Sequence, residues 1–439
     1  MNRNLFPNFP QIPTSELESA LRKAAGPSNF VEYGAISLRL ASAVPQFYGS
    51  KPAVLPWKLF SLSPEGPSLP FADVKACKPN EIIRFLRGQS LRAPFMLIQV
   101  RPADLIRERA ILIELFKRFL TRDFDEKRFE WLYHANPCGS ARAWVACESV
   151  GSAVIGAAAA FPRRISFSGV EKEGWVLGDF CLDERYRSLG PALQLQRACL
   201  EVTRDSSGAF CYDFPSERMM AIYKRLGVTQ TGIMVRWARP LRATRRIESV
   251  VRSKTLAKAL AAPVEIALTY RGWKGDREAG DLQLHEGQCD EEFDLLNDRV
   301  CRMPGIFTIR TAKYLNWRYL ANPTAKCEIL TARREGALVG YAVFTSFGNE
   351  GRIVDLCSED APGLIGLLLA GVVQELSPRG IETISLNAWE FHPWSHVFER
   401  AAFRRRETAP VVTYAPQDSQ MFGSKHQPSW YLMQGERDI

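Results

Sequence analysis

The stretch GWVLGDFCLDERYRSLGPALQLQRACL, residues 174–200, decides the fold of this chain. An apolar run from Trp175 to Leu182 predicts a buried strand, and the polar, arginine-rich segment 183–188 predicts a turn. From Leu189 onward the apolar residues recur at helical spacing. A strand, a short loop and a helix start form an arrangement that binds phosphate, because the first N–H groups of a helix lack acceptors and its dipole favours an anion.

The residues at the predicted helix start fit this purpose. Gly190 lets the backbone approach a ligand closely. Pro191 suits the first helical position, where its missing N–H matters least. Ala192 keeps the helix start uncrowded, and Arg185 and Arg187 add positive charge. We therefore expect the loop to bind an anion.

The segment from Arg187 to Ala192, RSLGPA, resembles motif A of the GNAT superfamily, the acetyl-coenzyme A-dependent N-acetyltransferases. That motif reads Q/R-x-x-G-x-G/A after the fourth strand of the family's fold. The resemblance implies that acetyl-coenzyme A is the acyl donor and that main-chain atoms of Phe180, Cys181 and Leu182 hold its pantetheine arm. It also implies that the pyrophosphate binds at Arg187, Ser188, Leu189, Gly190, Pro191, Ala192 and Leu193.

A second segment, from Ser216 to Val228, resembles motif B of the same family, N-x-x-A-x-x-x-Y-x-x-x-G-F. Tyr223 matches the tyrosine that protonates the leaving thiolate, and a phenol suits this role because it is a donor at neutral pH. A core aromatic is the alternative for Tyr223. Ser216 stands where the family often has asparagine, so we expect it to cap the helix and to contact the coenzyme.

Acyl transfer to an amine also needs a general base. Asp179, directly before the pantetheine segment, is the predicted base. Asp213 on the next predicted strand is the alternative, and an ordered water could serve either. A structural role for Asp179 stays open, because Asp355 repeats it later in the chain. No metal ion is implied.

The chain contains an internal repeat. The segment FEWLYHANP, residues 129–137, matches LNWRYLANP, residues 315–323, so that Trp131 recurs as Trp317 and Tyr133 as Tyr319. The later elements SAVIGAA and DFC recur as ALVGYAV and DLC. Several aligned identities in the same order indicate two copies of one unit.

The second copy departs from both motifs. Where the phosphate loop should recur, it carries Glu359 and Asp360, whose carboxylates repel phosphate, and Phe398 stands where Tyr223 stood. We therefore expect the second copy to bind coenzyme A poorly and to supply half of the acceptor pocket. A cluster of aromatic and histidine side chains could line that pocket: Trp389, His392, Trp394 and His396.

These patterns predict an α/β (α+β) chain of two tandem GNAT-like domains, each a mixed central sheet flanked by helices. The predicted parts are an N-terminal extension 1–93 that packs on the first domain, a catalytic domain 94–240, a basic linker 241–280 and a degenerate domain 281–439. Strands are expected at 95–100, 141–147, 153–161 and 209–213, helices at 15–25, 105–119, 129–134 and 216–226, and loops at 45–70 and 101–104.

The composition is typical of a globular protein from a reducing compartment. The chain has 439 residues, a net charge of +9 and ten cysteines without any C-x-x-C pair, which favour anionic partners and a reducing compartment. We expect a cytoplasmic protein without nucleic acid partners or a membrane-spanning segment. The basic linker predicts a solvated helix, with peripheral contact to anionic lipid as the alternative.

The chain is most similar in character to GNAT-like proteins of bacterial polysaccharide gene clusters, which implies an amine acceptor on an amino sugar or a polysaccharide precursor. Three other functions stay open. One is a Fem-type aminoacyltransferase, and another is an N-acyltransferase that depends on an acyl carrier protein. The third is a non-catalytic binding protein whose sites are both inactive. The sequence does not decide the acceptor.

Overall fold

The computed structural model describes residues 40–42, 57–60, 70–73, 98–148, 153–204, 209–242, 280–359, 362–416 and 429–437. The chain divides into two compact units, residues 1–95 and 96–439. The predicted helix at 15–25 and the basic segment 243–279 lie outside the described residues, as does Asp360.

The described part of the unit 1–95 is a small antiparallel sheet in the order β1-β2-β3. Its strands are β1 (Leu40–Ser42), β2 (Trp57–Phe60) and β3 (Pro70–Asp73). The prediction of a loop over residues 45–70 is therefore wrong at β2. Prolines and glycines on both sides of Trp57–Phe60 favoured a loop prediction, although these four residues include good strand formers.

The unit 96–439 holds the repeat, and we refer to residues 98–240 as the first half and 280–437 as the second half. The elements of the first half are β4 (Ile98–Pro102), α3 (Arg109–Phe119), α4 (Glu126–Phe129), η1 (Glu130–His134), β5 (Arg142–Glu148), β6 (Val154–Phe167), β7 (Val170–Leu182), η2 (Glu184–Tyr186), α5 (Leu189–Leu200), η3 (Glu201–Arg204), β8 (Phe210–Asp213), α6 (Glu217–Arg225) and β9 (Gln230–Pro240). Those of the second half are β10 (Asp281–Leu284), α9 (Glu291–Cys301), β11 (Ile306–Thr308), α10 (Ala312–Leu315), η5 (Asn316–Leu320), β12 (Cys327–Arg334), β13 (Ala337–Phe347), β14 (Glu350–Ser358), α11 (Pro362–Leu376), η6 (Ser377–Arg379), β15 (Thr383–Trp389), α12 (Ser395–Arg400), β16 (Arg404–Tyr414) and η7 (Gln434–Glu436).

Most predicted elements of the first half are confirmed, including the order β7, turn, α5. The turn expected at 101–104 is wrong for Arg101 and Pro102, which belong to β4, where Pro102 stands at the last position and costs the sheet little. The sequence reasoning did not predict β9 or β16. Both are long strands. In β9 most residues from Met234 to Arg239 are buried, whereas β16 buries only Val411 and Val412.

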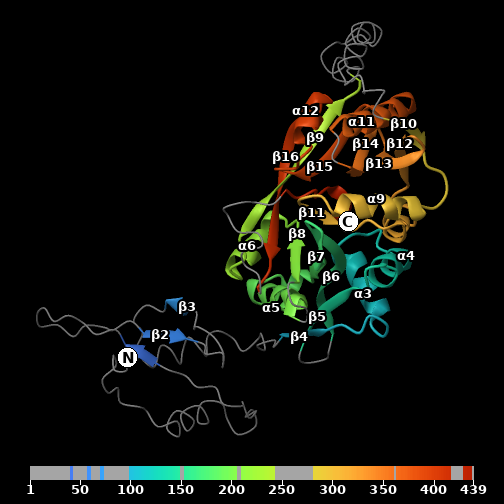
Figure 1. Ribbon diagram of the computed structural model, residues 1–439. Helices are drawn as coiled ribbons and strands as arrows, with labels where there is room; N and C mark the ends of the chain where they lie inside the picture. Colours follow the sequence, from blue (N-terminus) through green and yellow to red (C-terminus); the bar gives the residue numbers. More distant parts are fainter. Residues whose placement is uncertain are drawn as a thin grey trace, which may run out of the picture. The chain divides into compact units, whose positions relative to one another are not determined.

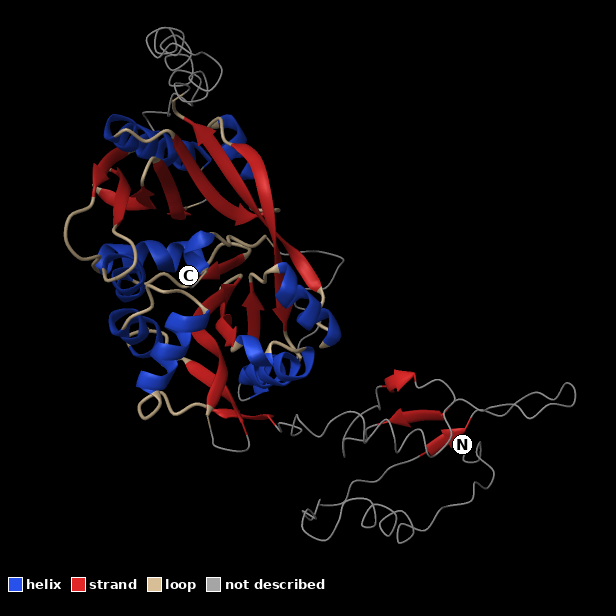
Figure 2. Ribbon diagram, turned by 180° about the vertical axis from the view of Figure 1, so that it is seen from behind, coloured by secondary structure: helices blue, strands red, loops and turns tan. Residues whose placement is uncertain are grey.

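A mixed sheet flanked by helices, the predicted fold class, is confirmed. Thirteen strands of the described chain form this sheet, in the order β10-β12-β13-β14-β15-β9-β16-β8-β7-β6-β5-β4 with β11 paired to β6. The two unpredicted strands occupy its centre and cross between the halves (Figures 1 and 2). Strand β9 leaves the first half and pairs with β15, whereas β16 leaves the second half and pairs with β8. Each half therefore completes its sheet with a strand of the other.

The repeated tryptophans meet at the contact between the halves. The indole Nε1 of Trp131 donates to the carbonyl oxygen of Trp317 over 2.7 Å, and the indole Nε1 of Trp317 donates to the carbonyl oxygen of Trp131 over the same distance. Both residues lie in a five-residue π-helical turn, η1 and η5. The two hydrogen bonds are reciprocal, as in a contact with two-fold symmetry.

One hydrophobic core continues from the first half into the second. It includes Phe116 of α3 and Trp131 in the first half and Phe344 and Leu368 in the second. A second core lies on the other face of the first half, where α5 and α6 contribute Leu195 and Tyr223. In the part of the chain that the structure describes, no helix is long and apolar enough to cross a membrane.

We predict that each tryptophan of the reciprocal pair stabilises the fold through its N–H group. Trp131→Phe should leave the carbonyl group of Trp317 buried without a donor and lower the free energy of unfolding by about 1–3 kcal/mol. Trp317→Phe should cost a similar amount, and urea denaturation measures both.

Trp394→Phe is the matched control, because the buried indole N–H of Trp394 has no hydrogen-bond partner in the described chain. Equal losses in all three variants would show that ring packing, and not the reciprocal hydrogen bonds, stabilises the contact.

Candidate active site

Strands β7 and β8 diverge, and this opens the site. They pair in parallel only from Gly174 and Phe210 to Val176 and Tyr212, although β7 continues to Leu182. Beyond Val176, none of the described strands pairs with the edge of β7 that faces β8. Unpaired main-chain N–H and C=O groups on such an edge can bind an extended ligand.

A β-bulge sets the direction of the diverging strand. The register between β6 and β7 shifts between Ala157 and Ala159, opposite Asp179 and Phe180. Asp179 has a φ of 47°, an uncommon backbone conformation for a residue with a side chain. A bulge bends its strand and increases the local twist, so the unpaired end of β7 turns away from β8.

A cavity of about 360 Å³ lies at this opening. Four of the residues considered from the sequence line it: Asp179, Phe180, Asp213 and Ser216. The other lining residues are Leu120, Thr121, Arg128, Ala159, Val176, Leu177, Gly178, Gln196, Phe214, Pro215, Met219 and Arg437. We call it the β7/β8 cavity.

The carboxylate of Asp179 is buried and accepts a hydrogen bond from the Tyr133 hydroxyl over 2.9 Å. The second half repeats this pair, because the Tyr319 hydroxyl donates to Asp355 over 2.8 Å. Asp355 is fully buried and also accepts from the guanidinium of Arg310. An Asp–Tyr pair that recurs in both halves indicates a structural contribution of Asp179, in addition to any role in the cavity.

Asp213 ends β8 and has a different environment. The Tyr223 hydroxyl donates to its carboxylate over 2.7 Å, and the side-chain amide of Gln196 donates to the Tyr223 hydroxyl over 2.9 Å. Burial raises the pKa of Asp213 to about 6, although the hydrogen bond from Tyr223 acts in the opposite direction. A carboxylate with a pKa close to neutral pH can exchange protons with a ligand in the cavity.

Tyr223 itself is fully buried, and burial together with Asp213 raises the pKa of its phenol well above the usual value. Its hydroxyl contacts the cavity through Asp213. The predicted cap of α6 is confirmed, since the Ser216 hydroxyl accepts a hydrogen bond from the N–H of Met219 over 3.4 Å. The sequence reasoning missed Gln196 and Tyr133, although Tyr133 belongs to the repeat.

The loop after β7 leads into a helix as predicted, but Pro191 is the third residue of that helix and not the first, a position in the first turn that still tolerates proline. Helix α5 begins at Leu189, and Ser188 is its N-cap residue but makes no side-chain capping bond. A Cβ atom added at Gly190 would meet no other atom within 4 Å. At this helix start the N–H of Ser188 donates to the carbonyl oxygen of Tyr186, the N–H of Ala192 donates to that of Ser188, and Pro191 has no N–H. The N–H groups of Leu189 and Gly190 are thus the ones available to an anion. Ala192 is buried against the core, as are Cys181 and Leu182 on β7.

Both arginines of the loop have partners. Arg185 pairs with Asp183 over 3.0 Å. Arg187 donates to the carbonyl oxygen of Leu182 over 3.1 Å and pairs with Glu184 over the same distance. Glu184 is exposed, and exposed salt bridges contribute little free energy, so Arg187 can exchange this partner for a phosphate at low cost. Asp183 is buried and accepts from two guanidinium nitrogens of Arg185, so Arg185 is held more firmly.

The second half lacks this chemistry at the corresponding positions. When Asp355 is aligned with Asp179, Leu386 is the counterpart of Asp213, because Ser385 pairs with Arg352 as Tyr212 pairs with Val176. The buried Phe398, the counterpart of Tyr223, packs against Trp237. Glu359 pairs with Arg299. The Asp213–Tyr223 pair of the first half is therefore not repeated, in contrast to the Asp179–Tyr133 pair.

The suggestion that aromatic residues of the second half line a pocket is wrong for three of the four. Trp389, His392 and Trp394 are buried, with exposed fractions of 1–2%, and stack on one another or on neighbouring aromatic rings. Burial lowers the pKa of His392 to about 3. The prediction failed because the aromatic rings of these residues fill the hydrophobic core, where large apolar side chains are most stabilising. His396 is exposed and contacts the carbonyl oxygen of Pro393.

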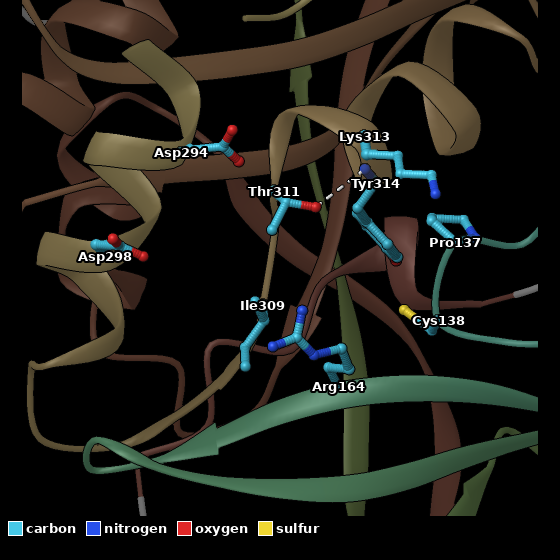
Figure 3. A pocket seen from close by; sticks show the side chains of 9 residues that line it. All are labelled: Pro137, Cys138, Arg164, Asp294, Asp298, Ile309, Thr311, Lys313 and Tyr314. Atoms are coloured by element: carbon cyan, nitrogen blue, oxygen red, sulfur yellow. Dashed lines mark hydrogen bonds between the residues drawn. The ribbon is translucent and has the colours of Figure 1, made fainter. Parts of the chain in front are cut away.

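Two other cavities lie near the contact between the two halves. One, of about 190 Å³, shares Phe214 and Arg437 with the β7/β8 cavity. The other, of about 470 Å³, is shown in Figure 3. There Arg164 of β6 pairs with Glu171, and Asp294 of α9 accepts from the N–H of Ala312, so these charges serve the fold. It contains none of the predicted site residues.

We predict that Tyr223 lowers the pKa of Asp213. In Tyr223→Phe that pKa should rise above the wild-type value of about 6, because the lost hydrogen bond favours the ionised carboxylate. NMR titration of ¹³C-labelled aspartate carboxyl groups, with the Asp213 signal assigned through Asp213→Asn, measures the change.

Tyr133→Phe is the control, since it removes the corresponding hydrogen bond from Asp179. It should leave the Asp213 titration unchanged. A wild-type pKa near the ordinary value of about 3.9 would contradict the burial of this carboxylate.

The fold has known relatives among solved structures, although no protein-family model matches the sequence and no curated protein matches it. A probable N-acyltransferase from Enterococcus faecalis has 13% sequence identity and a TM-score of 0.53, with 74% of this chain and 73% of that chain covered. A GCN5-related N-acetyltransferase from Anabaena variabilis has 13% identity and a TM-score of 0.52, with 73% of each chain covered. The chain therefore has the fold of the GCN5-related N-acetyltransferases, or GNAT proteins.

Proposed function

We propose that the protein transfers an acyl group from an acyl-coenzyme A, acetyl-coenzyme A in the first instance, to a primary amine. The observation that carries this proposal is the β7/β8 cavity, which joins a carboxylate of raised pKa to an unpaired strand edge. The GNAT fold supports acyl transfer at the level of the fold. Fold alone does not fix function, so the argument depends on the site.

The residues present fit the donor. The pantetheine arm would pair with the main chain of Phe180, Cys181 and Leu182 on the free edge of β7. Its pyrophosphate would bind the N–H groups at the start of α5, over residues 187–193, where Gly190 leaves open space. Ser216 lines the cavity and would contact the same substrate.

The reaction moves one proton through Asp213. The amine nitrogen attacks the thioester carbonyl carbon, the C–S bond breaks, and the products are an amide and a thiolate. We propose that Asp213 accepts the proton that the amine loses and returns it to the thiolate. Asp179 stays the alternative base. The tyrosine bond of Asp179 recurs in the second half at Asp355, which is fully buried, and this recurrence supports Asp213.

The proposed catalytic role of Tyr223 changes from direct proton donor to a residue that positions another group. The motif predicts that its hydroxyl protonates the thiolate directly. Because the hydroxyl is buried on Asp213 and Gln196, we propose that it acts through Asp213, by orienting the carboxylate and favouring its ionised form. The group that touches the substrate is then the carboxylate.

We propose that the first half alone binds the donor and that both halves, as two GNAT-like units, build the acceptor site. Leu386, Phe398 and Glu359 of the second half support this asymmetry. An amino sugar is the proposed acceptor. Support comes from the neighbouring 190 Å³ cavity, whose Asn387, Gln434 and Thr408 offer hydrogen bonds to sugar hydroxyls. The described cysteines are all free thiols, which supports a cytoplasmic location.

Gly190→Asp tests the donor site. The new carboxylate fits without a clash but repels the pyrophosphate, so affinity for acetyl-coenzyme A should fall by roughly 10-fold or more, equivalent to about 1.4 kcal/mol. Isothermal titration calorimetry on the full-length protein measures this.

The matched control is Gly363→Asp, at the second residue of α11, where an added Cβ atom also meets open space. Affinity should stay at the wild-type value there. A loss in Gly363→Asp and none in Gly190→Asp would move the donor site to the second half.

Asp213→Asn tests the base. It keeps the shape of the side chain but cannot accept a proton, so kcat should fall roughly 100-fold or more. Tyr223→Phe should cost less and should shift the acidic limb of the pH profile of kcat/KM to higher pH, because the pKa of Asp213 rises. Release of coenzyme A from acetyl-coenzyme A in the presence of amines and UDP-amino sugars gives the rates. A larger loss in a folded Asp179→Asn variant would assign the base to Asp179.

A further inference from the structure

Two arginines of the β7/β8 cavity form no ion pair in the described chain, although the charges of Arg437 and Asp213 influence each other's pKa. Arg128 lies at the third residue of α4, and Arg437 follows η7 near the C-terminus. Both line the cavity, and no ion pair or side-chain hydrogen bond joins either guanidinium to another described residue. Their contacts are with the rings of Phe124 and Phe214.

Arg128 is the more unusual of the two. Only 9% of the residue is exposed, and its Nε atom is buried without a hydrogen-bond partner. Removing a guanidinium from water costs several kcal/mol unless an anion or good acceptors replace the water. An arginine kept in this state at the wall of a cavity indicates that a ligand supplies the missing anion.

Arg437 is held at the cavity by contacts in the second half. The preceding Glu436 is buried, pairs with Arg310 over 2.8 Å and accepts a hydrogen bond from Thr308 over 2.6 Å. Arg318 donates to the carbonyl oxygens of Gly435 and Arg437. These bonds fix the segment whose last described residue reaches the first-half cavity.

The cavity thus contains two positively charged and two acidic side chains. Arg128 and Arg437 are positive, and Asp179 and Asp213 are the carboxylates. This arrangement complements a small molecule that carries both an amine and an anion. The amine would lie at the carboxylates, and the anion would accept paired hydrogen bonds from the planar guanidinium groups.

We propose that the acceptor amine carries an anionic group, a carboxylate or a phosphate, and that Arg128 and Arg437 bind this group. The inference rests on the proposed function, because only acyl transfer makes the bound amine an acceptor. It names a specificity that neither the fold nor the two motifs contain, because both arginines lie outside those motifs.

The test compares amines that differ only in the anion. Glucosamine 6-phosphate is paired with glucosamine, and glycine with glycinamide, and each is titrated by calorimetry into the full-length protein in the presence of coenzyme A. The charged member of at least one pair should bind roughly 10- to 100-fold more tightly, the usual size of a charge-assisted contact. The pair that responds distinguishes phosphate from carboxylate.

Arg128→Gln and Arg437→Gln should each remove most of this preference. Arg118→Gln is the matched control, because Arg118 is an exposed arginine of α3 that does not line the cavity. A structural arginine would lower the urea midpoint when replaced. Arg128→Gln should leave the midpoint unchanged or raise it, since it removes an unpaired buried charge.

Equal binding of charged and neutral amines, or no binding of either, would overturn the inference, as would an unchanged preference in folded Arg128→Gln and Arg437→Gln variants. Arginine-dependent binding without any acyl transfer would support the inference and refute the proposed function instead.

Discussion

The antiparallel pairing of β9 with β16 is the constraint on which the rest of the unit 96–439 depends. Each strand belongs by sequence to one half and completes the sheet of the other, so neither half has a finished sheet without its partner. The pairing of β16 with β8 extends to Val412 opposite Asp213, the carboxylate of raised pKa. Main-chain hydrogen bonds from the second half therefore help to place the group proposed to move the proton in the first. The second half has lost both motifs, but it still contributes strand β16 to the sheet that holds Asp213.

Two carboxylates close to one cavity acquire different properties from their surroundings. Asp179 lies in a β-bulge and is bonded to Tyr133, in an arrangement that Asp355 and Tyr319 repeat. Asp213 ends its strand under a tyrosine and a glutamine, and burial raises its pKa. The bulge bends the strand and opens the cavity, whereas the half-buried end of β8 supplies a carboxylate that can exchange a proton near neutral pH. One aspartate thus shapes the site and the other is suited to the chemistry.

The second half also reaches the site through the end of the chain. A buried network of Arg310, Asp355 and Glu436 anchors the segment that carries Arg437. A buried ion network of this kind contributes less to stability than to a defined arrangement, because desolvation offsets much of its Coulomb attraction. Here the defined arrangement places a cation at a cavity built from strands of the other half. The charge pattern of the β7/β8 cavity is consequently a property of the whole unit.

The sequence by itself determined the local elements and the repeat. The strand, turn and helix at 174–200, the Ser216 cap and the matching segments around Trp131 and Trp317 all follow from periodicity, capping chemistry and identity over short distances. The tertiary structure decided the exchange of β9 and β16, the bonding of Tyr223 to Asp213 and the approach of Arg128 and Arg437 to one cavity. These features depend on contacts between residues far apart in the chain, and pairing between distant strands leaves no short-range pattern that a single sequence can reveal. The buried tryptophans of the second half are a further example. A cluster of aromatic residues gives the same sequence pattern whether it lines a pocket or fills a core, so the sequence could not distinguish the two.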